Sequence, residues 1–165
     1  MSGKRKKLAV LLTLIPVLAL MVTIFCFSAQ KAEASDRTSG GIVTRVIALL
    51  YPHFDEMPEE EQEQIIHIFS VLVRKCAHLA EYLLLGAALM AHVKAISACR
   101  SVRRPKLLSW LIGSFYAASD ELHQLFVPGR SGEIKDVLLD SLGVLLGVLL
   151  LGLLWKARGK RRTSS

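Results

Sequence analysis

Four long apolar stretches constrain this chain more than any other feature of its sequence. They cover residues 8–27, 65–93, 107–127 and 137–155. A helix needs about 20 largely apolar residues to cross the hydrocarbon core of a bilayer, so each stretch has the length of a span. With 52% hydrophobic and 21% charged residues, the chain is too apolar for a disordered protein or a typical soluble domain. The sequence therefore predicts an all-α polytopic membrane protein with four transmembrane helices, forming a single domain over residues 1–165.

The first apolar stretch has a secretory signal peptide as its alternative interpretation. The basic run Lys4–Lys7 precedes it, and Ala32-Glu33-Ala34 resembles a cleavage site. The apolar region of a signal peptide is roughly 7–15 residues long, whereas Leu8–Phe27 is uncharged throughout and longer. We expect this stretch to be retained as a span.

The basic residues are segregated along the chain. They gather before the first span, between the second and third, and after the fourth, whereas Ser28–Gln64 has eight acidic residues against Lys31, Arg37 and Arg45. Because loops rich in Lys and Arg stay in the cytoplasm, we expect both termini inside and the acidic segment outside. The net charge of +7 then reflects topology, so the expected partner is the lipid bilayer and not nucleic acid.

The outer segment is expected to contain local structure of its own. From Ile42 to Leu50 the apolar residues repeat at helical spacing, which predicts a short amphipathic helix that rests on the outer membrane surface. Pro58 followed by Glu59-Glu60-Glu61 is typical of a helix start, and this helix is expected to continue into the second span.

No metal site, disulfide framework or cofactor is expected. The three cysteines, Cys26, Cys76 and Cys99, stand singly and form no C-x-x-C pair. Three histidines have no neighbours that suggest a function, and we assign them none: His53, His67 and His92.

Ionisable residues inside the apolar stretches are the strongest functional signal. Each costs about 2.5–3.5 kcal/mol at the centre of a span on insertion scales, so they need partners or a water-filled pocket. Arg74, His78 and Glu81 follow at i, i+4 and i+7 on one helical face. With four spans, the polar residues of the later spans and Arg130 on the Val127–Gly132 turn should meet them in the outer half of the membrane. The candidate site on these elements comprises Arg74, Lys75, His78, Glu81, Tyr82, Asp120, Glu121, Gln124, Arg130, Asp136 and Asp140. We expect Arg74 within reach of Asp120 or Glu121, and Arg130 near Asp136 or Glu81.

The same residues form motifs that resemble those of the VanZ-like family of small bacterial membrane proteins. In chain order the motifs are Phe27-Ser28-x-Gln30, Arg74-Lys75-x-x-His78-x-x-Glu81-Tyr82, Asp120-Glu121-x-x-Gln124-x-Phe126-x-Pro128-Gly129-Arg130, and Asp136 followed by G-x-x-x-G. The resemblance adds Ser28 and Gln30 to the candidate site. It also implies a protein of the bacterial plasma membrane that gives low-level resistance to the glycopeptide teicoplanin. The family often has Asn where this chain has Asp140, which leaves the charge state of this part of the candidate site open.

Three functions remain open for the polar residues. They could bind a lipid-linked cell-wall precursor or the glycopeptide itself, because Arg74, Lys75 and Arg130 suit phosphate or carboxylate groups. They could instead supply acid–base groups or metal ligands for a reaction on a lipid-linked substrate, with His78 and Glu81 at the centre. The third possibility is a purely structural network that holds the helices together.

Overall fold

The computed structural model describes residues 3–98, 100–130 and 132–163, apart from the side chains of residues 32–39 and 159–163. Five α-helices and a short 3-10 helix make up this part of the chain, which contains no strand. Their bounds are α1 Gly3–Ser28, α2 Ala32–Leu50, η1 Phe54–Glu56, α3 Glu59–Ser97, α4 Pro105–Gln124 and α5 Ile134–Thr163. The predicted all-α class is confirmed.

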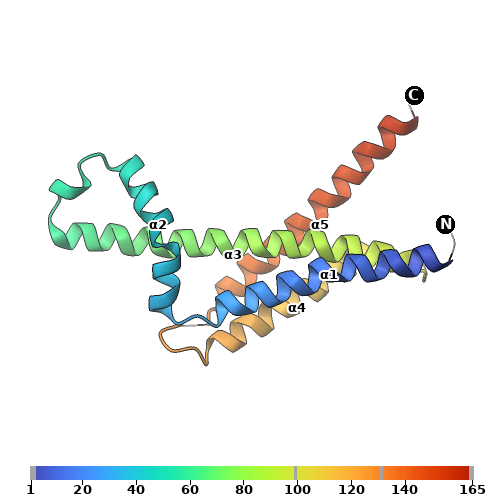
Figure 1. Ribbon diagram of the computed structural model, residues 1–165, viewed down its shortest axis with the longest axis horizontal. Helices are drawn as coiled ribbons and strands as arrows, with labels where there is room; N and C mark the ends of the chain where they lie inside the picture. The colour runs from blue at the N-terminus through green and yellow to red at the C-terminus, as the bar shows by residue number, and fades with distance from the viewer. Residues whose placement is uncertain (1–2, 99, 131, 164–165) are drawn as a thin grey trace.

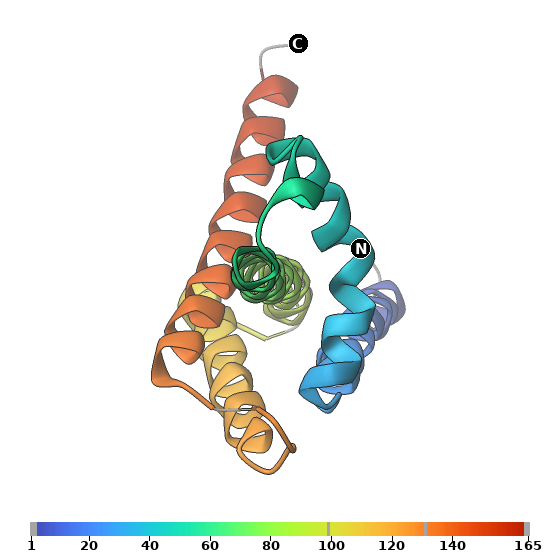
Figure 2. The ribbon, with the colours of Figure 1, turned by 90° about the vertical axis from the view of Figure 1, so that its left-hand side faces the viewer.

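Helix α3 is the central element of the fold. It contacts each of the other four α-helices. In Figure 1, α1 and α4 run along α3 while α5 crosses it obliquely, and both chain termini lie toward the same end. Figure 2, which looks along α3, shows α1, α4 and α5 arranged around it. The central position of α3 brings its polar face close to all the elements that carry the predicted site.

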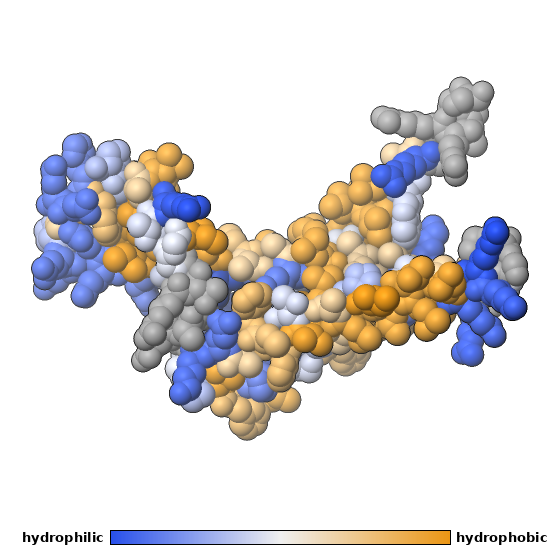
Figure 3. Space-filling view, in the orientation of Figure 1, coloured by the Kyte–Doolittle hydropathy of each residue, from blue (hydrophilic) through white to orange (hydrophobic). Residues whose placement is uncertain are grey.

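Three helices, α1, α3 and α5, are long and apolar enough to cross a membrane. Apolar side chains such as Leu11, Ile15 and Val22 are more than half exposed along α1, and the exposed apolar surface of the molecule is broad (Figure 3). Such a surface suits contact with lipid. Helix α4, expected to be a span, is not among the three because polar residues occupy its second half. The four-span count therefore stays a prediction, as does the membrane placement of α4.

The core lies where α5 crosses α3. Tyr82 and Leu85 are fully buried against Val144 and Val148. At Gly147 an added Cβ would lie 1.9 Å from the carbonyl oxygen of Leu83. The absence of a side chain there allows the two backbones to approach closely, which is the packing that the G-x-x-x-G motif predicts.

The segment between α1 and α3 is helical over the predicted region, but its helix is longer. Helix α2 begins at Ala32 rather than near Ile42, and it runs across α3 in Figures 1 and 2. Val43 and Ile47 are buried, whereas Leu49 is 80% exposed. That α2 rests on a membrane surface stays a prediction.

Helix α3 starts directly after Pro58, where the sequence predicts it. Its first turn holds three glutamates, which interact favourably with the positive end of the helix dipole. The third predicted span ends earlier than expected, because α4 stops at Gln124 and the chain turns there.

Candidate functional site

A cavity of about 300 Å³ lies between the middle of α3, the end of α4, the α4–α5 turn and the start of α5. These four parts of the chain carry all of the polar motifs except the first, which lies at the end of α1. Of the predicted site residues, those that line the cavity are Arg74, Lys75, His78, Glu121, Gln124, Arg130, Asp136 and Asp140. The tertiary structure therefore brings residues of separate motifs to one hollow.

Two contacts at the cavity join α3 to α5. The Lys75 ammonium forms an ion pair with the Asp136 carboxylate. Nδ1 of His78 lies 3.7 Å from Oδ2 of Asp140. Asp140 is only 1% exposed, and within the described residues neither of its carboxylate oxygens accepts a hydrogen bond. The two groups therefore lie next to each other without a hydrogen bond between them.

Glu121 joins the end of α4 to the start of α5. Its Oε1 accepts a hydrogen bond of 3.1 Å from Nε2 of Gln124, and its Oε2 accepts one of 3.2 Å from the backbone N–H of Glu133. Glu133 directly precedes α5, so the Glu121 carboxylate satisfies a free donor at the positive end of this helix. This contact gives Glu121 a structural role.

Arg130 joins the α4–α5 turn to the end of α1. Its Nε donates a hydrogen bond of 3.0 Å to the carbonyl oxygen of Gln30, and Nη2 donates one of 3.3 Å to that of Phe27. These carbonyls lie at the C-terminal end of α1, where backbone acceptors lack helical partners. Gly129, before Arg130, has a φ of 79°, a left-handed conformation that glycine adopts without strain. The turn is therefore built to direct Arg130 toward both α1 and the cavity.

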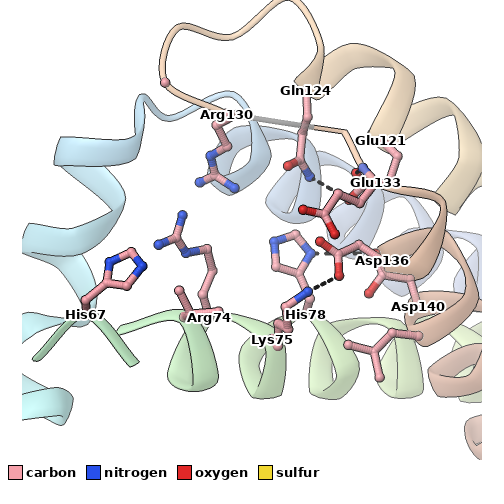
Figure 4. A pocket seen from close by; sticks show the side chains of 13 residues that line it. His67, Arg74, Lys75, His78, Glu121, Gln124, Arg130, Glu133, Asp136 and Asp140 are labelled. Atoms are coloured by element: carbon pink, nitrogen blue, oxygen red, sulfur yellow. Dashed lines mark hydrogen bonds and ion pairs between the residues drawn. The ribbon is translucent and has the colours of Figure 1, made fainter. Parts of the chain in front are cut away.

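The charged groups are distributed unevenly around the cavity. In Figure 4 the guanidinium groups of Arg74 and Arg130 point into it from opposite walls and face each other. The carboxylates of Glu133 and Asp136 lie on the other side, with the His78 ring between the two sets. The cavity thus has a cationic part and an acidic part.

The other five predicted residues do not line this cavity. Ser28 and Tyr82, both fully buried, lie beside the carboxylate of Asp120, which is 3% exposed. Glu81 faces the same carboxylate. These side chains come from α1, α3 and α4 and form a second, interior polar cluster, whereas Gln30 contributes its backbone carbonyl to Arg130. The predicted site therefore comprises the residues that line the cavity and an adjoining buried group, in which the Tyr82 ring stacks on that of His78 with ring centroids 6.5 Å apart.

Sequence reasoning missed two polar residues of the cavity, His67 and Glu133. His67, to which we assigned no function, precedes Arg74 by seven residues and so lies on the same face of α3. Glu133 precedes Asp136 by three residues. Extending the polar face of α3 by two turns toward the N-terminus, and that of α5 by one turn, would have identified both.

No group of three His, Cys, Asp or Glu side chains in the described ranges is arranged to hold a metal ion. His78 and Glu81, the pair considered as metal ligands, belong to different polar groups, because His78 lines the cavity and Glu81 faces Asp120. Ser131, in the predicted turn, lies outside the described residues.

Comparison with known proteins gives one match. The family model VanZ/LLP1 matches residues 13–155, a range that includes every predicted site residue. No curated protein and no solved structure matches the chain. The family match covers most of the sequence and agrees with the resemblance in its motifs. This all-helical, membrane-like protein therefore belongs to the VanZ/LLP1 family.

Proposed function

We propose that this protein binds the phosphate-bearing headgroup of a lipid-linked cell-envelope precursor in the cavity between α3, α4 and α5. The observation that carries the proposal is the pair of guanidinium groups, Arg74 and Arg130, that face the cavity from opposite walls. Two like charges that face each other repel, and an oxyanion between them offsets that repulsion. Guanidinium groups also bind phosphate in a bidentate manner, which fixes the ligand's orientation.

The size of the cavity favours a headgroup over an entire antibiotic. At about 300 Å³ it lies at the lower end of the range for small-ligand pockets. A phosphate with a few attached atoms fits such a space, whereas a glycopeptide does not. In this proposal the low-level teicoplanin-type resistance that the family resemblance implies arises from precursor binding and not from capture of the antibiotic.

The proposed orientation places the cavity in the outer half of the plasma membrane. The basic segments lie at the start of α1, between α3 and α4, and at the end of α5, whereas the cavity is built at the other ends of α1, α4 and α5. Loops rich in Lys and Arg stay in the cytoplasm, which makes both termini cytoplasmic. Helix α4, with 20 residues, is about 30 Å long and matches the hydrocarbon core, which supports its proposed role as a span.

Native mass spectrometry of the purified protein with undecaprenyl phosphate tests the proposal. We expect wild type to hold one lipid and Arg74→Gln to bind at least about tenfold more weakly, a loss of about 1.4 kcal/mol. Arg74→Lys, which keeps the charge but loses the planar fork, should fall between them. Arg103→Gln, at an exposed position between α3 and α4, is the matched control and should bind like wild type.

Thermal unfolding of each variant shows whether a binding loss is only a folding defect. The proposal is wrong if stably folded Arg74→Gln binds undecaprenyl phosphate as tightly as wild type. It is equally wrong if undecaprenol, which lacks the phosphate, competes as well as the phosphorylated lipid.

The enzyme alternative keeps one specific observation in its favour, the His78–Asp140 pair at the cavity wall. A histidine oriented by a carboxylate can accept the proton of a water that attacks phosphorus, while the bond from phosphorus to the lipid oxygen breaks and that oxygen takes up a proton. The products would be undecaprenol and inorganic phosphate. The same mass spectra, recorded after incubation, distinguish binding alone from hydrolysis by the mass of the lipid.

A further inference from the structure

We infer that the cavity selects a zwitterionic headgroup, in which a primary amine stands close to the phosphate. This inference rests on the proposed binding function and concerns the half of the cavity that the two arginines do not occupy. Basic and acidic groups both line it: Arg74, Lys75 and Arg130 against Glu121, Glu133, Asp136 and Asp140. A cavity made for phosphate alone would not be expected to carry more acidic than basic side chains.

Two of these carboxylates have partners within the protein. Asp136 pairs with Lys75, and Glu121 accepts hydrogen bonds from Gln124 and from the backbone of Glu133. Each of these two carboxylates therefore has a partner within the protein when no ligand is bound. They therefore do not by themselves indicate an amine.

The other two carboxylates are different. Asp140 is 1% exposed and lines the cavity, yet both its oxygens lack a hydrogen-bond donor among the described residues. Glu133 is exposed, and its carboxylate is directed toward the same space as the two guanidinium groups in Figure 4. In the described structure no hydrogen bond or ion pair to the Glu133 carboxylate is present. An ammonium group in this half of the cavity would give the buried Asp140 oxygens a hydrogen-bond donor and would pair with the Glu133 carboxylate.

The two halves of the cavity make opposite demands on one ligand. A purely anionic headgroup could bind beside the arginines, but Glu133 would repel it and it would offer no hydrogen-bond donor to Asp140. A phosphate with an attached amine suits both halves at once, because each of its charged groups meets protein groups of opposite charge, and this pairing offsets the cost of taking it out of water. The small volume requires the amine to be only a few bonds from the phosphate.

This chemistry is available from two sources in a membrane. One is the aminoalkyl phosphate headgroup of a glycerophospholipid, and the other is an undecaprenyl phosphate that carries an amino sugar. Native mass spectrometry with matched lipids separates them. The probes are phosphatidylethanolamine, its N-acetylated form, undecaprenyl phosphate, and undecaprenyl phosphate with an amino sugar.

We expect an amine-bearing lipid to bind at least about tenfold more tightly than its amine-free or N-acetylated partner, about 1.4 kcal/mol in free energy. Glu133→Gln should remove most of this preference without weakening undecaprenyl phosphate, because only the amine contact is lost. Glu60→Gln, an exposed acid at the start of α3, is the matched control and should keep the preference. Asp140→Asn tests the contribution of the buried Asp140 carboxylate in the same way, with thermal unfolding as a check on folding.

The outcomes separate this inference from the function on which it rests. Undecaprenyl phosphate could bind as tightly as its amino-sugar form, and N-acetylated phosphatidylethanolamine as tightly as phosphatidylethanolamine. That result would exclude selection of a zwitterion and would leave phosphate binding intact. If no phosphorylated lipid binds at all, the proposed function fails and this inference with it. An amine preference in one of the two matched lipid pairs supports the inference and identifies the source of the ligand.

Discussion

The ion pair between Lys75 and Asp136 is a contact at the cavity in which both partners belong to the protein. The two side chains are 40% and 27% exposed, they connect α3 to α5, and each is the partner of the other. We expected the pairing of α3 with the acidic residues to involve Arg74. That Arg74 reaches Asp120 or Glu121 stays a prediction. Lys75 forms its ion pair with Asp136, and the Arg74 guanidinium faces that of Arg130 across the cavity.

Neutralising Lys75 and Asp136 one at a time and together tests this structural role. Lys75→Gln leaves an uncompensated carboxylate and should destabilise the protein by about 1–3 kcal/mol, between the values for exposed and buried pairs. The double variant Lys75→Gln/Asp136→Asn removes both charges and should recover most of the lost stability. Thermal unfolding in detergent measures both, with the exposed Lys156→Gln as control.

Lipid binding by the same proteins completes this test. Recovery of stability together with undecaprenyl phosphate binding would assign the pair a structural role. A double variant no more stable than Lys75→Gln would show that the pair does not hold α3 and α5 together.

At the scale of the helices, the crossing of α3 and α5 determines where the site residues meet. Gly86, Gly143 and Gly147 lie in this crossing, and a Cβ at any of them would come within 3 Å of backbone atoms of the other helix. The close approach sets the register of the two helices. It thereby places Asp136 and Asp140 opposite Lys75 and His78, more than sixty residues earlier in the chain.

Gly147→Ala should force these helices apart. Its Cβ would meet the carbonyl oxygen of Leu83 at 1.9 Å and the amide nitrogen of Ala87 at 2.8 Å, and backbone atoms cannot move aside as a flexible side chain can. We expect a loss of about 1–3 kcal/mol in thermal unfolding, typical of overpacking, accompanied by weaker lipid binding. Gly152→Ala is the control, because its nearest atom is Cε of Lys106 at 3.2 Å, and alanine favours a helix more than glycine does. Equal stability of the two variants would contradict this account of the crossing.

At the scale of the whole molecule, the distribution of charge predicts its orientation in the membrane. Acidic residues gather at the start of α3, and basic residues gather near the termini and between α3 and α4. In Figure 3 hydrophilic surface lies at the two ends of the molecule, and apolar surface lies between them. This separation is what a protein that spans a bilayer requires.

Cysteine labelling of intact cells tests the orientation. In a variant whose natural cysteines are replaced by serine, a membrane-impermeant maleimide should label Glu60→Cys and should not label Arg104→Cys until the cells are opened. Both positions are exposed in the structure, so a failure to react reports the membrane and not burial in the protein. If only Arg104→Cys is labelled in intact cells, the orientation in the membrane is the reverse of the one proposed.

The sequence by itself determined the class of the protein, the positions of its helices and the family motifs. These properties depend on composition and spacing within short segments, such as the uncharged run Leu8–Phe27 and the helix start after Pro58, and so they need no knowledge of neighbouring helices. The sequence did not determine the extent of α2, whose N-terminal half is polar and shows no apolar periodicity.

Only the tertiary structure decided which polar residues share a site. Spacing placed His78 and Glu81 on one broad face of α3, but the packing around that helix directs His78 to the cavity and Glu81 toward Asp120. It also joined Arg130 to the end of α1, about one hundred residues earlier, and brought His67 and Glu133 to the cavity. The physical reason is that one polar helix face can contact two different neighbouring helices. Close backbone contacts set the rotation and the crossing of the helices, and these decide which neighbour each side chain contacts.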